Sequence, residues 1–281
     1  VKDGKVIVCS NQWRSLWIDI EVTKDIAPGN YEIELRLKKE GDVVTSAKQR
    51  LTVIGVELPK QKIMHTEWMH ADCLADYYHV DVFSEEHWKI LENYFKEYVK
   101  RGCNMMLTPL FTSPLDTAVG LERTTTQLIK VEVVKGEYRF DFSELKRWID
   151  LCKKCGIEYY EMSHLFSQWG AKYAPKVVAE VDGKEEKIFG WHTPAVGEYT
   201  RFLKAFLPQL IEKLKEWNID QVTYFHISDE PREEHLESYR AAKESLGNML
   251  DGFHTFDALS SYEFYRHGLI DKPIPGNNEI E

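Results

Sequence analysis

Residues 224–231 read Tyr224-Phe225-His226-Ile227-Ser228-Asp229-Glu230-Pro231, an apolar run that ends in two adjacent acids and a proline. A short run of this kind, bounded by a breaker, is typical of a buried strand. Helical periodicity precedes it over residues 199–217 and follows it over residues 233–250. Strands that alternate with helices imply a parallel sheet with right-handed crossovers, so this stretch predicts an α/β fold.

The same alternation runs from about Lys62 to the end of the chain. The predicted strands are 63–68, 103–108, 158–164, 221–228 and 253–259, and a sixth begins near Ile274. The predicted helices are 84–101 with Ser84 as its N-cap, 142–155, 199–217, 233–250 and a short one at 262–267. Segments 128–142 and 177–189 are predicted β-hairpins that turn at Lys135-Gly136 and Asp182-Gly183.

The order of these elements predicts a partial TIM-like (β/α) barrel. No GxGxxG motif or P-loop follows a predicted strand, which disfavours a doubly wound nucleotide-binding sheet. Five or six strands fall short of the eight that close a barrel, so we expect a fragment that is incomplete at its C-terminus. In such a barrel the active site lies at the carboxyl ends of the strands.

The first sixty residues follow a different pattern. Apolar and polar residues alternate over 5–9, 15–21, 31–38 and 43–56, which predicts antiparallel strands. We interpret residues 1–60 as the C-terminal part of an antiparallel β-sandwich and residues 61–281 as the catalytic barrel domain. Four strands are few for a sandwich, and the chain starts at Val1 without a leader pattern. We therefore expect the chain to begin in the middle of a longer protein.

Charge and cysteine content limit the classes of function. The net charge of −10 argues against a nucleic-acid partner, and no apolar stretch approaches the roughly 20 residues of a membrane span. Five scattered cysteines do not resemble a secreted disulfide framework, which favours the cytoplasm, although the compartment and the oligomeric state stay open. Cys152 and Cys155 form a CxxC inside a predicted helix without a second ligand pair, so we expect neither a metal nor a cofactor.

Asp229 and Glu230 are the strongest candidates for catalysis. Adjacent, partly buried carboxyls resist double ionisation, which raises one pKa and keeps a proton available for a general acid. Neighbouring side chains point in different directions, so the two do not suit an acid and a nucleophile on opposite sides of one glycosidic bond. They suit substrate assistance, in which Glu230 protonates the leaving oxygen and Asp229 holds the nitrogen of a 2-acetamido group. The alternative is that the pair only caps the following helix.

Four stretches of this sequence resemble glycoside hydrolase family 123 and its relatives with a DUF4091 domain. They are 226–231 (HISDEP), 68–78 (WMHADCLADYY), 104–109 (NMMLTP) and 163–170 (SHLFSQWG). The resemblance covers nearly the whole chain and implies a β-sandwich before a TIM-like barrel. It also implies a β-N-acetylgalactosaminidase with retaining, substrate-assisted catalysis, in which Asp229 stabilises the acetamido group and Glu230 is the general acid/base.

Other polar and aromatic residues at the predicted strand ends could bind a sugar. Aromatic faces stack on pyranose rings, whereas amides and acids bind hydroxyl groups. The predicted substrate-binding residues are Glu67, Trp68, Asn104, His164, Gln168, Trp169, His226 and Asp257. Ordinary packing is the alternative for each of them. His65, Glu67, His70 and Asp72 lack the HExxH spacing of a zinc-binding helix, so no metal site is predicted there.

Three functions remain open from the sequence. The leading hypothesis is removal of a terminal β-linked N-acetylhexosamine, with N-acetylgalactosamine as the expected sugar and a 2-acetamido glycan as the partner. The second is a conventional retaining glycosidase whose nucleophile lies outside this chain. The third is a non-catalytic carbohydrate-binding barrel protein.

Overall fold

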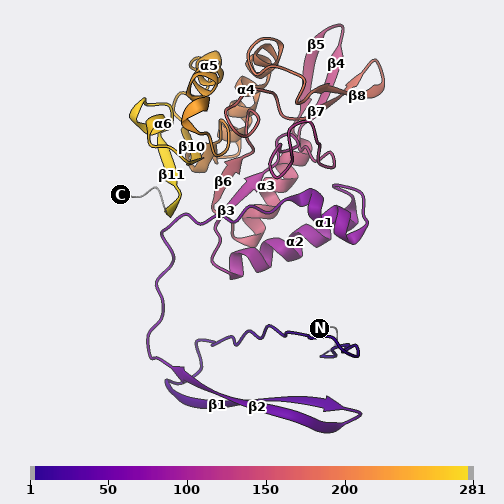
Figure 1. Ribbon diagram of the computed structural model, residues 1–281, viewed down its shortest axis with the longest axis vertical. Coiled ribbons are helices and arrows are strands. Elements are labelled where there is room, and N and C mark those ends of the chain that lie inside the picture. The colour runs from indigo at the N-terminus through magenta and orange to yellow at the C-terminus, as the bar shows by residue number, and fades with distance from the viewer. Residues whose placement is uncertain (1–3, 278–281) are drawn as a thin grey trace. The chain divides into compact units, whose positions relative to one another are not determined.

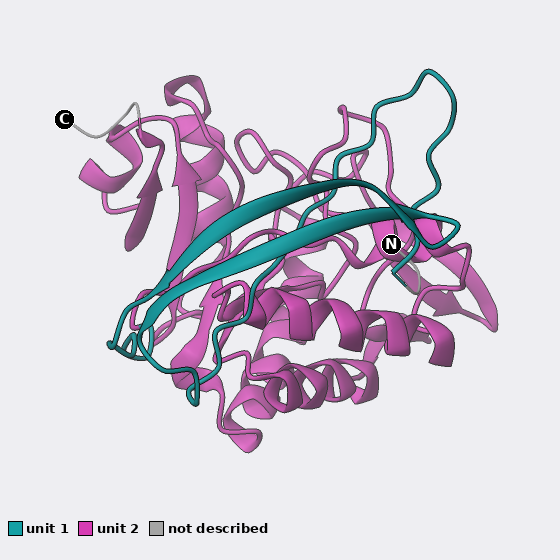
Figure 2. Ribbon diagram, turned by 90° about the horizontal axis from the view of Figure 1, so that it is seen from below, with its two compact units in different colours: residues 1–61 teal, residues 62–281 magenta. Residues whose placement is uncertain are grey.

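The computed structural model describes residues 4–277 and shows a mixed α/β protein with parallel and antiparallel sheets (Figure 1). The chain divides into two compact units, Val1–Gln61 and Lys62–Glu281, which Figure 2 colours separately. The first unit holds a two-stranded sheet, and the second holds a five-stranded and a four-stranded sheet. Within the described residues, no helix has the length and apolar character needed to cross a bilayer.

A five-stranded parallel sheet forms the centre of the second unit. Its strands are β3 (Met105–Thr108), β6 (Tyr159–Met162), β9 (Thr223–Phe225), β10 (His254–Leu259) and β11 (Lys272–Pro275). Their order is β11-β10-β9-β6-β3, and all neighbouring pairs are parallel. Strands of this sheet that follow one another along the chain therefore lie side by side, whereas the strand order of a doubly wound sheet reverses direction at one point. The described strands form an open sheet with β3 and β11 at its edges.

The prediction of a strand over residues 63–68 is wrong, because this segment is extended but joins no sheet. It begins to pair with the start of β3, since the His65 carbonyl accepts from the amides of Asn104 and Met105 at 3.0 and 3.1 Å. The hydroxyl of Tyr98 then comes between the two chains. It accepts from the Glu67 amide at 2.8 Å and donates to the Met105 carbonyl at 2.7 Å, which takes the place of a ladder bond.

All five predicted helices are present, although the one predicted over 233–250 is shorter. The hydroxyl of Ser84 accepts from the His87 amide at the start of α2, and Gly156 ends α3 with a φ of 96°. The helices are α1 (Ala71–Tyr78), which was not predicted, α2 (Glu85–Lys100), α3 (Ser143–Cys155), α4 (Glu198–Glu216), α5 (Leu236–Leu246) and α6 (Glu263–Arg266). Short 3₁₀ turns, η1 (Asp220–Val222) and η2 (Glu233–His235), precede β9 and α5.

The core of the second unit lies between these helices and one face of the parallel sheet. Its largest fully buried side chains include Phe95, Trp148, Phe202, Phe206 and Phe225. A smaller cluster of Met105, Tyr224 and Phe256 covers the other face of the sheet. Side chains alternate along a strand, so every second residue of the sheet points away from the main core and toward this second face. The candidate site begins on this second face.

Both predicted hairpins are confirmed, and together they form a second sheet. They consist of β4 (Lys130–Val134) with β5 (Glu137–Asp141), and β7 (Val177–Val181) with β8 (Lys184–Phe189). Both turn residues of each hairpin have positive φ angles, at Lys135-Gly136 and at Asp182-Gly183, as a tight hairpin requires. Parallel pairing of β4 with β7 joins the hairpins in the order β5-β4-β7-β8.

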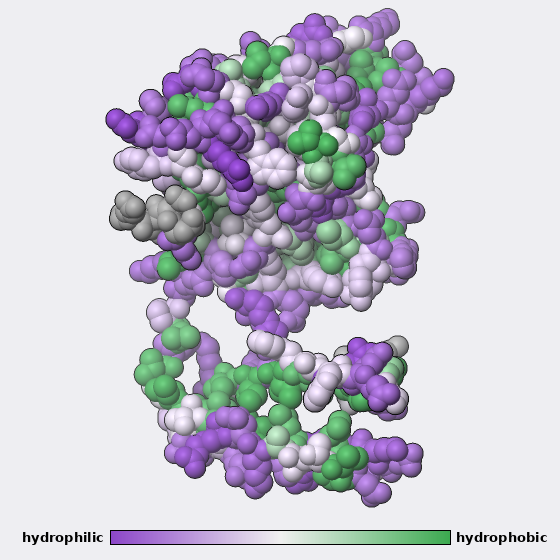
Figure 3. Space-filling model, in the orientation of Figure 1, coloured by the Kyte–Doolittle hydropathy of each residue, from purple (hydrophilic) through white to green (hydrophobic). Residues whose placement is uncertain are grey.

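Over residues 4–61, the first unit contains one hairpin, β1 (Gly29–Lys39) with β2 (Asp42–Val53). The prediction of strands over 5–9 and 15–21 is wrong, because neither segment forms a strand. Alternation makes a segment suitable for a sheet, but a strand also needs a partner for its backbone groups. Apolar side chains of this unit, such as Ile18, Ile20, Leu35 and Leu37, are exposed. Hydrophobic residues are accordingly visible on the surface in Figure 3.

Candidate active site

Asp229 and Glu230 follow the carboxyl end of β9, where the sheet meets the loops. The strand ends at Phe225, earlier than predicted, because the backbone of residues 226–229 pairs with a loop instead. Asp229 is 8% exposed, while Glu230 is exposed and has a φ of 40°, a left-handed conformation that costs a non-glycine residue energy. The two side chains therefore occupy different environments, one buried and one open to solvent.

The loop after β6 holds the acid-bearing segment in place. Backbone amides of Leu165, Phe166 and Trp169 donate to the carbonyls of His226, Ile227 and Asp229 at 3.1, 3.0 and 2.8 Å. The Ser228 hydroxyl donates to the Ser167 carbonyl at 2.8 Å and accepts from the amides of Gly170 and Ala171 at 3.3 and 3.2 Å. These bonds fix the direction in which the chain leaves β9.

Gly170 is the tightest point of this loop. Its φ is +109°, and a Cβ added there would lie 2.7 Å from both Cβ and Cγ of His235. The Gly170 carbonyl also accepts from the Ser238 hydroxyl at 2.6 Å. Only glycine fits this position, so the loop packs directly against the segment that leads into α5.

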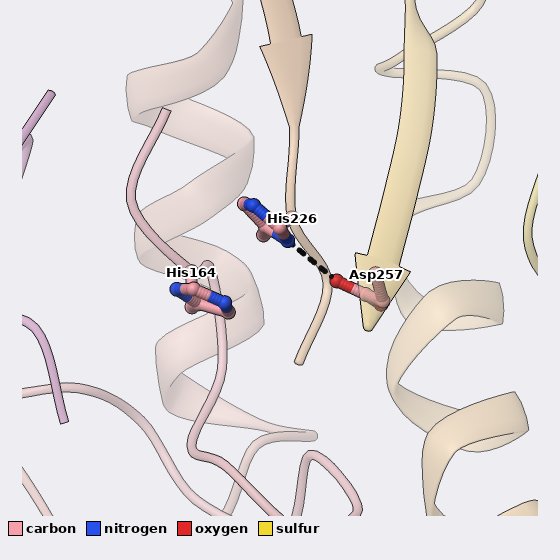
Figure 4. A group of neighbouring side chains, drawn as sticks. All are labelled: His164, His226 and Asp257. Carbon is pink, nitrogen blue, oxygen red and sulfur yellow. Dashed lines mark hydrogen bonds and ion pairs between the residues drawn. The ribbon is translucent and has the colours of Figure 1, made fainter. Parts of the chain in front are cut away.

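A buried network of charges lies beneath the two acids. His226 Nδ1 lies 2.9 Å from Asp257 Oδ1, as Figure 4 shows. His226 Nε2 lies against Glu161 Oε1, so the imidazole bridges β6 and β10. Trp68 Nε1 and the Thr66 hydroxyl donate to the two oxygens of Glu161 at 2.6 and 2.8 Å. Asp257 Oδ2 accepts from the Tyr239 hydroxyl and from the Ser228 amide. The network thus ends one residue before Asp229.

His226 is protonated at neutral pH. Burial opposes its charge, but Glu161 and Asp257 outweigh this effect and raise the pKa of His226 to about 9. Asp257 is itself buried, which raises the pKa of its carboxyl despite the nearby imidazolium. His164, His226 and Asp257 offer potential metal-ligand atoms within 4.8 Å of one another. However, both ring nitrogens of His226 donate to carboxylates, so this side chain has no lone pair for a metal.

His164 packs against this network but does not join it. Its ring stacks on that of His226 with centroids 4.1 Å apart (Figure 4). The Trp68 ring meets it edge-on at 5.2 Å. His164 is 2% exposed, and neither ring nitrogen has a hydrogen-bond partner in the part of the chain that the structure describes. Burial, with the charges of His226 and His70, lowers its pKa well below the ordinary value. His164 is therefore a neutral imidazole with free bonding capacity.

Asp229 also has unused bonding capacity. Its Oδ1 atom is buried and has no partner within residues 4–277. Burial and then the charge of Glu230 raise the pKa of Asp229 to about 7, although the His226 imidazolium acts in the opposite direction. A carboxyl that titrates near neutral pH with one unsatisfied oxygen is typical of a functional site.

The remaining predicted residues fall into two groups. Trp68 belongs to the buried network through Glu161, His164 and His226. Gln168 and Trp169 lie in the loop that pairs with the acids: Gln168 Nε2 donates to the Thr117 carbonyl at 2.7 Å, and Trp169 is 40% exposed beside Asp229. The structure does not bring Asn104 or Glu67 to them. Asn104 precedes β3, at the amino end of the sheet, where its amide group bonds the backbone of Ile63 and His65.

Glu67 is exposed, and its carboxylate lies 3.3 Å from His65 Nε2. Thr66 and Trp68 both bond Glu161, so alternation along the extended segment turns His65 and Glu67 the other way. Sequence reasoning did not identify Glu161, Thr66 and Tyr239. The signal for Glu161 was present, since a lone acid between apolar residues of a buried strand needs a charged partner.

A small pocket lies beneath the loop between β3 and β4. Its walls include His70, Ser113, Arg123 and Ser163, the neighbour of His164. Asp229 and Glu230 are not among its lining residues. The two acids therefore form no part of the wall of this pocket.

Comparisons with known proteins identify the family. The model of the family described as glycoside hydrolase 123, catalytic domain, matches residues 68–281. Among solved structures, the chain is similar to a family 123 glycoside hydrolase from Clostridium perfringens, whose published description concerns glycolipid glycan hydrolysis. The identity is 20% and the TM-score 0.67, over 92% of this chain and 46% of the other, so the likeness shows a shared fold with less than half of that protein.

No protein of curated function matches the chain. The family model nevertheless covers most of the sequence, including both candidate acids and the buried network apart from Thr66. The protein therefore belongs to glycoside hydrolase family 123.

Proposed function

We propose that this protein removes terminal β-linked N-acetylhexosamine, with N-acetylgalactosamine as the preferred sugar, by retaining, substrate-assisted hydrolysis. The observation that carries the proposal is the pairing of a buried acid with an unsatisfied oxygen, Asp229, and an exposed acid, Glu230, at one strand end. The family's TIM-like barrel would provide the other walls of the site. The glycan of a glycolipid is a reasonable natural substrate, given what the Clostridium perfringens relative is described to hydrolyse.

The two acids would have separate roles. Glu230 would protonate the glycosidic oxygen as the bond to the anomeric carbon breaks, because its exposed carboxyl is open to an incoming substrate. Asp229 Oδ1 would accept the N–H of the 2-acetamido group, whose carbonyl oxygen then attacks the anomeric carbon. Water would open the resulting oxazolinium ion, with Glu230 taking its proton, and the anomeric configuration would be retained.

The buried network supports this assignment in two ways. Glu161 and Asp257 are the other buried acids at these strand ends, and both are engaged by His226, so neither is free to act as a nucleophile. The imidazolium also favours the ionised form of Asp229, which is the form that accepts an N–H bond. His164 would bond a sugar hydroxyl with its free ring nitrogens, and Trp169 would offer an aromatic face.

Turnover of aryl 2-acetamido-2-deoxy-β-galactosides tests the proposal. Asp229→Asn and Glu230→Gln should each lower kcat by about 100-fold or more, as loss of acid–base groups does. Glu233→Gln removes an exposed acid just beyond the site and is the matched control. The loss in Glu230→Gln should be greater for an alkyl or sugar leaving group than for 4-nitrophenol, which needs little protonation. Undiminished activity in both site variants would overturn the assignment.

The conventional retaining mechanism predicts a different substrate range. An enzyme with its own nucleophile should cleave aryl β-galactosides that carry a 2-hydroxyl group, whereas substrate assistance requires the acetamido group. Comparison of these two substrates separates the mechanisms. Sugar binding without turnover of either substrate would indicate the third possibility, a carbohydrate-binding protein.

A further inference from the structure

Asp116 is an exposed acid in the loop between β3 and β4 that is held in an unusual backbone conformation. Its φ is 57°, in the left-handed region, and its side chain is 72% exposed. His70 Nε2 lies 3.0 Å from its Oδ2 atom. A left-handed backbone conformation persists only where surrounding contacts hold it, so the contacts of this loop determine where the carboxylate lies.

The loop around Asp116 is braced on two sides. Arg123 bonds the carboxylate of Asp72 in α1 through Nε and an Nη atom at 2.7 and 3.1 Å, and both side chains are about nine-tenths buried. The same guanidinium donates to the Leu115 carbonyl at 3.2 Å. On the other side, Gln168 Nε2 donates to the Thr117 carbonyl at 2.7 Å. Bonds to both of its neighbours therefore fix the backbone of Asp116.

These bonds place Asp116 close to the candidate acids. Gln168 precedes Trp169, whose amide donates to the Asp229 carbonyl, so the loop connects to the acid-bearing segment through two hydrogen bonds. The charge of Asp116 is among the influences that raise the pKa of Asp229, and that of His70 is among those that lower the pKa of His164. The Asp116–His70 pair thus lies within electrostatic range of both groups.

Two buried polar groups indicate that a ligand binds beside this pair. His164 and Asp229 Oδ1 lack partners among the described residues, although each side chain is more than nine-tenths buried. Buried polar atoms are seldom left without a hydrogen bond, so they are expected to bond a polar molecule. Asp116 and His70 act electrostatically on these two groups, so a sugar bound to them would lie within the field of the Asp116 carboxylate.

We propose that Asp116 is a specificity-determining residue that selects neutral, hydroxyl-bearing sugars and excludes sulfated or carboxylated ones. The inference rests on the proposed function and names the class of its substrate. Sugar hydroxyls donate strongly to an ionised carboxylate, whereas a sulfate offers no proton and adds negative charge beside Asp116, Asp229 and Glu230. His70 acts as a positioning residue: its ring nitrogen lies 3.0 Å from Oδ2, and Arg123 Nη1 lies 3.9 Å from the same oxygen, so Oδ1 is left to bond a sugar hydroxyl.

The test compares Asp116→Asn with the wild type on an aryl 2-acetamido-2-deoxy-β-galactoside and its 6-sulfate. Asparagine keeps the shape and tolerates the left-handed region, so the fold should persist. Asp182→Asn is the matched control, since Asp182 is also exposed with a positive φ, at the tip of the β7–β8 hairpin. Binding of N-acetylgalactosamine and its 6-sulfate is measured alongside by NMR chemical-shift titration, which needs no turnover.

Asp116→Asn should lower kcat/KM on the neutral substrate by about tenfold. The ratio of kcat/KM on the neutral substrate to kcat/KM on the 6-sulfate should fall by a similar factor. Asp182→Asn should match the wild type. If the wild type cleaves neither substrate but prefers the neutral sugar in binding, and Asp116→Asn loses that preference, the inference stands while hydrolysis fails. An unchanged preference in Asp116→Asn, or no binding of either sugar to the wild type, would overturn it.

Discussion

Replacing Asp229 by asparagine should make the protein more stable at pH 8 while it removes activity. Burial and the charge of Glu230 raise the pKa of Asp229 from 3.8 to about 7, so its ionised form is disfavoured in the folded protein. At about 1.4 kcal/mol for each pKa unit, this difference corresponds to roughly 4 kcal/mol. The neutral amide avoids this cost, although it leaves a buried polar group in the same place. We therefore expect a gain of about 2 to 4 kcal/mol.

The pH dependence of this gain identifies its origin. A group whose folded pKa is raised stabilises the protein below its unfolded pKa, and that contribution is lost as pH rises through the folded pKa. The wild type should therefore lose this stability between about pH 4 and pH 7, and the variant should not. The difference between the two proteins should be near zero at pH 4 and largest above pH 7.

Urea denaturation at several pH values, followed by tryptophan fluorescence, measures the effect. Glu230→Gln should show part of the gain in stability seen for Asp229→Asn, because it removes the charge of Glu230, the second cause of the raised pKa of Asp229. Asp182→Asn, at an exposed turn, should change nothing. A gain that is absent at pH 8, or as large at pH 4 as at pH 8, would refute the electrostatic argument.

Three further predictions follow from the same contacts. The wild type should lose about 3 kcal/mol of stability between pH 6.5 and about pH 9, because His226 releases its proton in this range when the protein is unfolded but keeps it when the protein is folded. In urea denaturation at several pH values, Glu161→Gln should lose less stability over this range. An equal loss in the wild type and in Glu161→Gln would contradict the prediction. Gly170→Ala should cost about 1 to 3 kcal/mol in thermal unfolding, because its Cβ would meet His235, and an unchanged Tm would show that the loop is free to move. The kcat/KM of the wild type should rise with pH through about 7 as Asp229 ionises, and a flat profile from pH 6 to pH 8 would count against its role.

Local sequence signals predicted the helices and hairpins well. Ser84 and Gly156 mark helix ends because a side-chain oxygen or a left-handed glycine satisfies backbone groups there. Lys135-Gly136 and Asp182-Gly183 mark hairpin turns because both positions need positive φ angles. These devices act within a few residues and can be read without knowledge of distant partners.

Pairing between distant segments could not be predicted in this way. Segment 63–68 has the composition of a strand, yet the Tyr98 hydroxyl takes up the bonds that a ladder would need. Alternation over 5–9 and 15–21 likewise does not reveal whether a partner strand is present. The parallel contact between β4 and β7 depends on register across residues far apart in the chain.

The same limit applies to the candidate site. Asp229 and Glu230 were identified from a local pattern, because a strand that ends in two acids is unusual. Glu161 became evident only when β6 and β9 were placed side by side, which brought it to His226. Asp116 lies in a loop without a motif, and its position depends on Arg123 and Gln168. Residues that act through long-range bonds leave little trace in the sequence around them.

The most direct test of the central claim is a rate comparison across aryl β-galactosides whose 2-acetamido group carries zero, one, two or three fluorine atoms. Fluorine withdraws electrons from the amide carbonyl, so kcat should fall with each added fluorine if that carbonyl attacks the anomeric carbon beside Asp229 and Glu230. Rates that are independent of fluorination, or no turnover of any substrate in the series, would contradict substrate-assisted hydrolysis by this protein.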